Sequence, residues 1–222
     1  MSEKILDAVI VEPSAPAKAA VIWLHGLGAD GHDFEPVVPQ LGMPASTPTR
    51  FVFPHAPQRA VTVNMGYVMR AWYDIVSLDK ADEDEPGVLA SEGLVRALIQ
   101  REIDAGIPSE RIVVAGFSQG GAMALRTGLC YPHRLAGVMG LSCYLPISRR
   151  FKADAHPANQ ATEVFIAHGT VDPVVPFELG KDSYDYLQGL GYYASLHTYA
   201  VGHGVSPKEI SDIGAWLRKV LS

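Results

Sequence analysis

Residues Gly116 to Gly120 read Gly-Phe-Ser-Gln-Gly, the Gly-x-Ser-x-Gly pattern typical of a nucleophile elbow. They follow the apolar run 111–115 and precede small residues, which predicts a strand, a sharp turn and a helix. Such a turn needs neighbours without Cβ because its backbone is strained and closely packed. The turn would raise the Oγ of Ser118 above the sheet and place the N–H of Gln119 at a helix N-terminus, where negative charge is stabilised. This context favours a nucleophilic serine over an incidental serine in a glycine-rich turn.

A serine nucleophile needs a general base, usually histidine. His203 is flanked by glycines and lies between an expected strand and an expected capped helix, where open α/β sheets place residues that contact ligands. His197 is the rival, although a side chain inside a strand is fixed to one face. The other downstream histidines have positions typical of surface or turn residues: His133, His156 and His168. We therefore predict His203 as the base.

The base needs an orienting acid, and in this arrangement the chain order is serine, acid, histidine. Asp172 lies in His-Gly-Thr-Val-Asp-Pro-Val-Val-Pro, four residues past the end of an expected strand, in a loop stiffened by Pro173 and Pro176. Its carboxylate is expected to accept the Nδ1–H of His203. Three other aspartates lie in polar or helical surroundings typical of solvated charges: Asp154, Asp182 and Asp185.

The segment Trp23 to Gly31 reads Trp-Leu-His-Gly-Leu-Gly-Ala-Asp-Gly, and it fits two kinds of site. Its glycines spell the dinucleotide fingerprint G-x-G-x-x-G, but they also form a His-Gly loop able to stabilise an oxyanion. A dinucleotide site requires an acid at the end of the second strand. Here the run 50–53 is followed by Pro-His. We therefore predict an oxyanion loop whose donor is the N–H of Leu27, so the Leu27 side chain should matter little.

The elements that must position these residues follow from short apolar runs alternating with helical patterns. Strands are predicted at 19–24, 50–53, 111–115, 136–141, 163–168 and 195–200, and helices at 89–103, 119–130, 177–189 and from Pro207 onward, after a Ser206–Glu209 capping box. A strand at 5–11 is expected to form a hairpin with 19–24. The alternation predicts an open, mostly parallel sheet with helices on both faces.

Composition narrows the class of protein. The 222 residues are 48% hydrophobic and 19% charged with a net charge of −6, which fits a single globular domain over 1–222. Basic residues do not cluster, so we expect no nucleic-acid partner. No apolar stretch approaches a membrane span, and the N-terminus lacks a signal-peptide pattern, so we expect a cytoplasmic protein. Cys130 and Cys143 are expected to be reduced core thiols, and 79–87 a solvated acidic loop.

Several segments together resemble one family: LHGLGADGHDF, FPHAPQRAVTVNMGYVMRAWYDI, GFSQGGAMAL, HGTVDPVVP and GHGVSP. They are similar to the carboxylesterase/lysophospholipase/acyl-protein thioesterase family of α/β-hydrolases, in particular to its small bacterial carboxylesterases. The resemblance implies the triad Ser118, Asp172 and His203, an oxyanion hole of the Leu27 and Gln119 N–H groups, and no metal or cofactor. It also implies that Trp72 lines the acyl pocket.

The segment 144–162 is too short for a cap domain, so we expect an open site shaped by residues 54–80. The expected activity is hydrolysis of short-to-medium acyl carboxylic esters through an acyl-enzyme. Alternatives are a lysophospholipase or acyl-protein thioesterase acting on longer chains and, remotely, a nicotinamide-binding oxidoreductase. Expected partners are a small-molecule or lipid ester and, by analogy with the family, a second copy of the chain.

Overall fold

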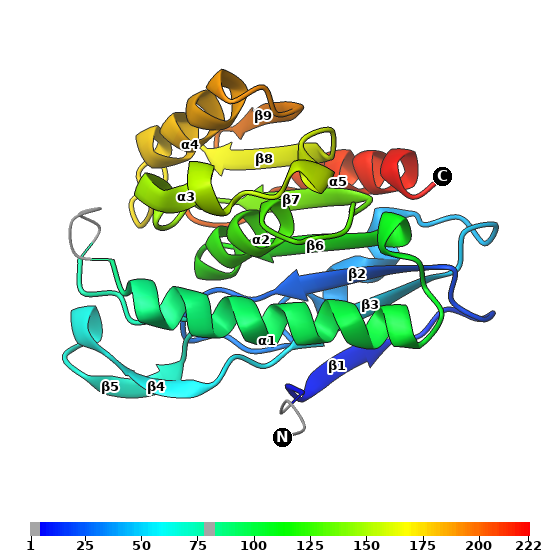
Figure 1. Ribbon diagram of the computed structural model, residues 1–222, viewed down its shortest axis with the longest axis horizontal. Coiled ribbons are helices and arrows are strands. Elements are labelled where there is room, and N and C mark those ends of the chain that lie inside the picture. Colours follow the sequence, from blue (N-terminus) through cyan, green and yellow to red (C-terminus); the bar gives the residue numbers. More distant parts are fainter. Residues whose placement is uncertain (1–4, 78–82) are drawn as a thin grey trace.

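A seven-stranded sheet runs through the protein in the order β1-β3-β2-β6-β7-β8-β9 (Figure 1). The computed structural model describes residues 5–77 and 83–222. The strands are β1 (Ala8–Val11), β2 (Ala19–Leu24), β3 (Thr49–Pro54), β6 (Ile112–Phe117), β7 (Gly137–Leu141), β8 (Glu163–Gly169) and β9 (Ala194–Tyr199). All neighbours are parallel except β1, which is antiparallel to β3. The predicted open, mostly parallel sheet is confirmed.

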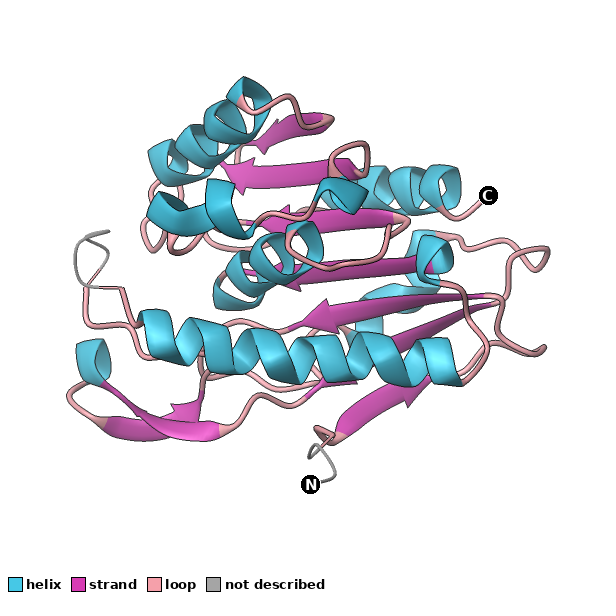
Figure 2. Cartoon of the chain, in the orientation of Figure 1, coloured by secondary structure: helices cyan, strands magenta, loops and turns pink. Residues whose placement is uncertain are grey.

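Helices cover both faces of this sheet (Figure 2). On one face lie α1 (Glu85–Asp104), α2 (Gln119–Leu129), α3 (Ser148–Asp154) and α4 (Phe177–Gly189), and on the other lie α5 (Pro207–Val220) and the 3-10 helix η1 (Glu35–Leu41). Alternate residues of the strands therefore enter two separate cores. Ile22 and Val114 pack in the core beneath α1 and α2, whereas Trp23 and Val113 pack in the core beneath α5.

The N-terminal strand differs from the prediction. β1 does not form a hairpin with β2 but pairs with β3, in the register Ala8↔Pro54 to Val11↔Phe51. All six residues of β2 are buried, and its two edges pair with β3 and β6. No edge of β2 is left for β1, so the hairpin prediction was wrong.

A small hairpin beside the sheet was not predicted. It consists of β4 (Gln58–Val61) and β5 (Tyr67–Arg70), joined through the 3-10 helix η2 (Thr62–Asn64). Met65 and Gly66 follow η2 with φ values of 56° and 76°, which turn the chain back. The hairpin strands are largely exposed, so they lack the apolar signal that marks the strands of the main sheet.

Buried ion pairs anchor α2, the helix that follows Gly-x-Ser-x-Gly. The guanidinium of Arg126 is 2% exposed and lies 2.8 Å from a Glu92 oxygen on α1 and 2.5 Å from an Asp154 oxygen on α3. Removing one partner of such a group leaves a buried charge, which is strongly destabilising. These ion pairs therefore hold together three of the four helices on this face, α1, α2 and α3.

The segment 144–162 forms no cap domain, as expected from its length. Its only helices are α3 and the 3-10 helix η4 (Pro157–Asn159). The acidic segment 79–87 lies partly outside the described residues, and its last three residues begin α1 rather than forming a loop. The Ser206–Glu209 capping box of α5 is present. The 3-10 helix η3 (Ser109–Arg111) directly precedes β6. No helix among the described residues is long and apolar enough to span a membrane.

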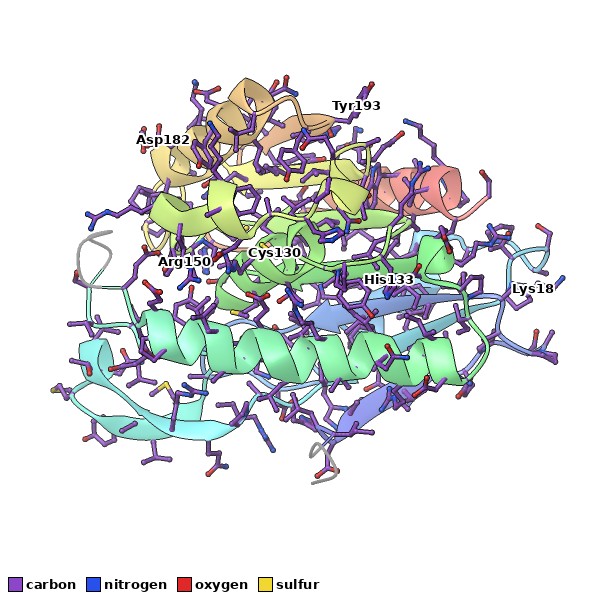
Figure 3. All side chains as sticks on the ribbon, in the orientation of Figure 1. Lys18, Cys130, His133, Arg150, Asp182 and Tyr193 are labelled. Carbon is purple, nitrogen blue, oxygen red and sulfur yellow. The ribbon has the colours of Figure 1, made fainter. Side chains whose placement is uncertain are left out.

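The two cysteines are free thiols inside the core. Burial raises the pKa of Cys130 to about 12 and also raises the pKa of Cys143. Both thiols therefore stay protonated at neutral pH and are poor nucleophiles. Side chains at the periphery, such as Asp182 and Tyr193, project away from the molecule (Figure 3).

Candidate active site

The turn between β6 and α2 holds Ser118 in a strained conformation. Its φ and ψ are 53° and −121°, a region that residues with a side chain rarely adopt. The two flanking glycines explain how the turn closes. A Cβ on Gly116 would lie 2.2 Å from the carbonyl oxygen of Gly120, and a Cβ on Gly120 would lie 2.3 Å from that of Leu24. The glycines therefore allow β2, β6 and α2 to meet directly beneath the serine.

Ser118, His203 and Asp172 come together although they lie far apart in the sequence. The Oγ of Ser118 is 3.0 Å from Nε2 of His203, and Nδ1 of His203 is 2.7 Å from Oδ2 of Asp172. An ionised Asp172 accepts the Nδ1–H, which leaves the lone pair of Nε2 facing the serine hydroxyl. This geometry allows His203 to take the proton of Ser118 during nucleophilic attack.

The environment of Asp172 favours its ionised form. Its other oxygen, Oδ1, accepts the N–H groups of Val174 at 2.8 Å and Val175 at 2.9 Å. Burial by itself would raise the pKa of Asp172, but the hydrogen bonds from His203, Val175 and Val174 outweigh burial and lower the pKa. The acid is therefore charged and fixed in direction at neutral pH.

His168 lies beneath the loop that carries Asp172. Its ring is fully buried, with Nε2 2.9 Å from the carbonyl oxygen of Val175 and 3.6 Å from Oδ2 of Asp172. The ring stands edge-on to Phe177. We expected this histidine to shape a turn, and the structure shows it connecting β8 to the far end of the acid loop.

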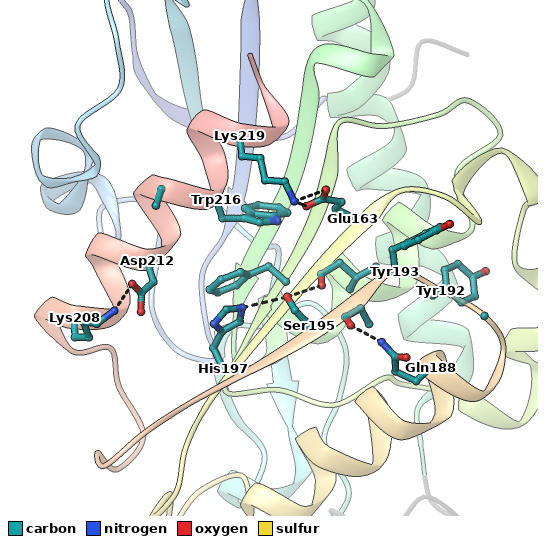
Figure 4. A pocket seen from close by; sticks show the side chains of 15 residues that line it. Glu163, Gln188, Tyr192, Tyr193, Ser195, His197, Lys208, Asp212, Trp216 and Lys219 are labelled. Atoms are coloured by element: carbon teal, nitrogen blue, oxygen red, sulfur yellow. Dashed lines mark hydrogen bonds and ion pairs between the residues drawn. The ribbon is translucent and has the colours of Figure 1, made fainter.

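The rival base, His197, lies elsewhere. It stacks on Phe165 with ring centroids 4.2 Å apart, in a groove between β9 and α5 (Figure 4). Its Nε2 lies 3.1 Å from Oγ of Ser195, and burial lowers its pKa. Among the described residues His197 has no contact with Ser118 or Asp172, so His203 is the only one of the two placed to act as base.

The loop after β2 passes beside the serine. A Cβ on Gly26 would lie 3.4 Å from Cβ of Ser118, and the N–H of Leu27 has no acceptor among the described residues. The N–H of Gln119 is in the first turn of α2, where the N–H groups lack partners within the helix. Leu27 and Gln119 line the same cavity as Ser118. Both residues thus lie beside Ser118, and their role as oxyanion donors stays a prediction.

Trp72 does not line the cavity beside Ser118, so the expectation that it lines the acyl pocket was wrong. Its side chain is fully buried, and it donates from Nε1 to the carbonyl oxygen of His25 over 2.9 Å. The next residue, Tyr73, lines the cavity instead, with its hydroxyl 3.2 Å from that of Tyr144. Sequence reasoning missed both tyrosines, because neither belongs to a catalytic motif.

A cavity of about 390 Å³ opens next to Ser118 and His203. This size is within the range of about 300–1,000 Å³ for small-molecule sites. Its wall carries apolar side chains from the hairpin region and from the acid loop: Val63, Ile75, Val174 and Val175. Asp33 is the one carboxylate among its described lining residues, which include no Lys or Arg. The expectation that 54–80 shapes the site agrees with the positions of Val63 and Ile75.

A known protein family and several known proteins match this chain along nearly its whole length. A family model described as Phospholipase/Carboxylesterase matches residues 6–221. Acyl-protein thioesterase 1 of Gibberella zeae is 42% identical over 231 residues, covering 100% of this chain and 98% of the relative. Acyl-protein thioesterase 1 of Neurospora crassa is 41% identical, covering 96% and 91%.

Two solved structures of plant proteins have a fold similar to that of this chain. Arabidopsis thaliana SOBER1 superposes with a TM-score of 0.87 at 33% identity, covering 93% of this chain and 100% of that chain. Zea mays acyl-protein thioesterase 2 also gives 0.87, at 30% identity and with coverage of 97% and 99%. The narrower resemblance to small bacterial carboxylesterases needs correction, since these relatives are fungal and plant proteins. The chain has the α/β-hydrolase fold and belongs to the phospholipase/carboxylesterase family.

Proposed function

We propose that the protein is a serine hydrolase that cleaves acyl thioesters, with Ser118, His203 and Asp172 as its catalytic triad. The observation that carries the proposal is the continuous hydrogen-bonded path from Oγ of Ser118 through His203 to Asp172, beside a cavity with an apolar wall. The names of the fungal relatives favour a thioester over an oxygen ester. Hydrolysis of carboxylic esters is the second candidate, favoured by the description of the family.

In the proposed reaction, the Oγ of Ser118 attacks the acyl carbonyl carbon while Nε2 of His203 takes the serine proton. The carbonyl oxygen becomes an oxyanion, which the N–H groups of Leu27 and Gln119 stabilise. Collapse of this intermediate breaks the bond to the thiol or alcohol, which leaves with the proton from His203. Water then attacks the acyl-enzyme with His203 as base, which releases the acid and restores Ser118.

The surface near the cavity supports an acyl chain of more than a few carbons. Val63 and Ile75 line the cavity, and further apolar side chains on the adjoining hairpin are exposed to solvent: Met65, Tyr67 and Val68. A chain longer than the cavity would continue across this apolar surface and remove it from water, which is favourable. These apolar side chains therefore support longer acyl chains better than the short-to-medium range expected from the sequence.

A substrate panel tests the proposal. Acyl thioesters and matched oxygen esters of 4 to 16 carbons should be hydrolysed by the wild-type protein, with kcat/KM rising with chain length for the thioesters. Ser118→Ala should reduce kcat to the background rate, and a fluorophosphonate should modify Ser118 in the wild type. A folded Ser118→Ala protein with wild-type activity would refute the proposed nucleophile.

The same panel separates the two candidates. A steep fall of kcat/KM beyond about six carbons, together with a preference for oxygen esters, would favour the short-chain carboxylesterase. For the remote oxidoreductase alternative, NAD(P)H at 100 times its Kd would stabilise the protein by about 2.7 kcal/mol, so an unchanged unfolding midpoint would eliminate it.

A further inference from the structure

We propose that Trp72 is a positioning residue that holds the two oxyanion donors, the N–H groups of Leu27 and Gln119, at a fixed separation. This inference rests on the proposed function. Trp72 is fully buried and does not line the cavity, so we expect it to make no direct contact with substrate. Its backbone and its indole ring are, however, hydrogen-bonded to the two segments that carry the donors.

The first connection runs from the indole to the Leu27 loop. The Nε1–H of Trp72 donates to the carbonyl oxygen of His25 over 2.9 Å, and both side chains are buried. The ring of His25 is itself held, because its Nε2 accepts the N–H of Ala56 at 3.0 Å. This bond leaves the proton on Nδ1, which donates to the carbonyl oxygen of Gly26 over 2.7 Å. Burial lowers the pKa of His25, so the ring stays neutral in this form.

The carbonyl of Gly26 matters because it shares a peptide unit with the N–H of Leu27. A trans peptide is planar, so the direction of the carbonyl sets the opposite direction for the N–H. The bond to His25 thus aims the first donor, and the indole of Trp72 fixes the carbonyl of the preceding peptide. Rotation of this loop would require the buried indole to lose its acceptor.

The second connection runs from the backbone of Trp72 to the start of α2. The Oε1 atom of Gln119 accepts the N–H of Trp72 at 2.8 Å, and its Nε2 donates to the carbonyl oxygen of Tyr73 over 2.7 Å. The Gln119 side chain is buried, and the N–H of the same residue is the second donor. Ser91 on α1 also donates a hydrogen bond to the carbonyl oxygen of Trp72. All the polar groups of Trp72 therefore have partners.

Separation and direction decide how well such donors work. They must lie about 2.7–3.1 Å from the developing oxyanion, and loss of one donor slows the chemical step by about 10²–10³-fold. A misplacement of about 1 Å can cost about 100-fold. A residue that joins both donors should therefore act on kcat and on transition-state binding, with little effect on binding of the ground state.

Trp72→Phe tests the inference, with Trp23→Phe as its control. The control makes the same change at another buried tryptophan. Trp23 is 1% exposed, and its Nε1 has no partner among the described residues, so the control breaks no indole hydrogen bond there. We expect Trp72→Phe to lower kcat by about 10- to 100-fold, with KM changed less than threefold. An alkyl trifluoromethyl ketone, whose adduct with serine carries an oxyanion, should lose affinity by the same factor. Trp23→Phe should change neither quantity more than threefold once active sites are counted with a fluorophosphonate.

The outcomes separate this inference from the proposed function. A wild-type protein that hydrolyses no ester or thioester and is not modified at Ser118 contradicts the proposed function, and this inference with it. If the wild type is active but Trp72→Phe behaves like Trp23→Phe, the inference alone is overturned. The same holds if Trp72→Phe raises KM at constant kcat, because that result would assign Trp72 to binding of the acyl chain.

A second pair of variants keeps the inference testable if Trp72→Phe does not fold. Gln119→Met retains the N–H donor and the size of the side chain but removes both hydrogen bonds to residues 72 and 73. It should lower kcat and the trifluoromethyl ketone affinity together at nearly constant KM. Gln100→Met, on the exposed surface of α1, is the matched control and should leave all three unchanged. Gln119→Met with wild-type kcat would overturn the inference.

Discussion

Nδ1 of His203 lies 2.7 Å from Oδ2 of Asp172, while the other oxygen of that carboxylate accepts two backbone N–H groups of its own loop. The two oxygens thus make different hydrogen bonds. Oδ1 fixes the direction of the carboxylate within the loop, and Oδ2 fixes the tautomer of His203. A substitution at position 172 can therefore alter the bond to His203 and preserve the bonds within the loop.

Asp172→Asn should preserve the fold and abolish most of the activity. The Asn oxygen can still accept the N–H groups of Val174 and Val175, which directs the amide nitrogen at His203. That nitrogen donates to Nδ1 and forces the proton to Nε2, so the ring can no longer accept the proton of Ser118. We expect kcat to fall by about 10³–10⁴-fold with little change in the unfolding midpoint. Steady-state kinetics and thermal unfolding measure this, and Asp182→Asn on exposed α4 should match the wild type.

His168→Phe should weaken the acid loop. The substitution leaves the carbonyl of Val175 without its buried donor, which costs about 1–3 kcal/mol of unfolding free energy. We also expect kcat to fall, because Asp172 loses a fixed support, and His168→Gln should restore part of both quantities by donating to the same carbonyl. His197→Phe, on the neighbouring strand β9, is the control for denaturation and kinetic measurements. Equal kcat for the Phe and Gln variants at position 168 would contradict this role.

Gly120→Ala should damage both folding and catalysis. Its Cβ would lie 2.3 Å from the carbonyl oxygen of Leu24 and 2.5 Å from that of His25, and backbone cannot move aside cheaply. We expect a loss of about 2–4 kcal/mol in chemical denaturation, at or above the usual cost of overpacking. Gly93→Ala on exposed α1 meets no atom within 4 Å and should instead stabilise by about 0.5–1 kcal/mol. Similar effects of the two substitutions would show that the close approach at Gly120 is unimportant.

Glu209→Gln should make stability less dependent on pH. Burial raises the pKa of Glu209 from its ordinary value of 4.5 to about 7. The N–H of Ser206 opposes this rise, and Asp212 adds to it. The pKa of Glu209 is thus higher in the folded state than in the unfolded state, so the folded state binds the proton more tightly. The folded state therefore loses stability as pH rises from about 4.5 to 7.

A glutamine in place of Glu209 carries no charge and avoids this loss. At pH 8 Glu209→Gln should be more stable than the wild type by roughly 1–3 kcal/mol, and near pH 4.5 the two should be similar. Urea denaturation across this range measures the difference. Glu110→Gln, at an exposed acid, should show no such trend, and a wild-type advantage that grows with pH would contradict the prediction.

The motifs with a local signal were predicted well from the sequence. Gly-x-Ser-x-Gly, the proline-stiffened Asp172 loop and the glycine-flanked His203 each follow a strand, and the ends of parallel strands meet at one edge of a sheet. Their convergence therefore follows from the strand pattern. The capping box of α5 depends only on Ser206 and Glu209, so it too could be found without a structure.

The wrong predictions concern contacts between residues that lie far apart in the sequence. The pairing of β1 depends on which edges of β2 are occupied, a property of the assembled sheet. The burial of Trp72 depends on a carbonyl 47 residues away in the chain. The β4–β5 hairpin buries few side chains, so periodic hydrophobicity did not indicate it.

The pairing of β2 with β6 limits how this protein can change during evolution. Leu24 pairs with Gly116, so the loop that carries Leu27 and the turn that carries Ser118 leave the sheet side by side. One residue inserted into either strand would shift that alignment by about 3.3 Å, whereas catalytic groups tolerate displacements of only about 0.5 Å. The edge strand β1 does not lead into any of the loops that carry these groups and does not have this constraint. We therefore expect insertions and deletions among relatives to accumulate around β1 and to be absent from β2 and β6.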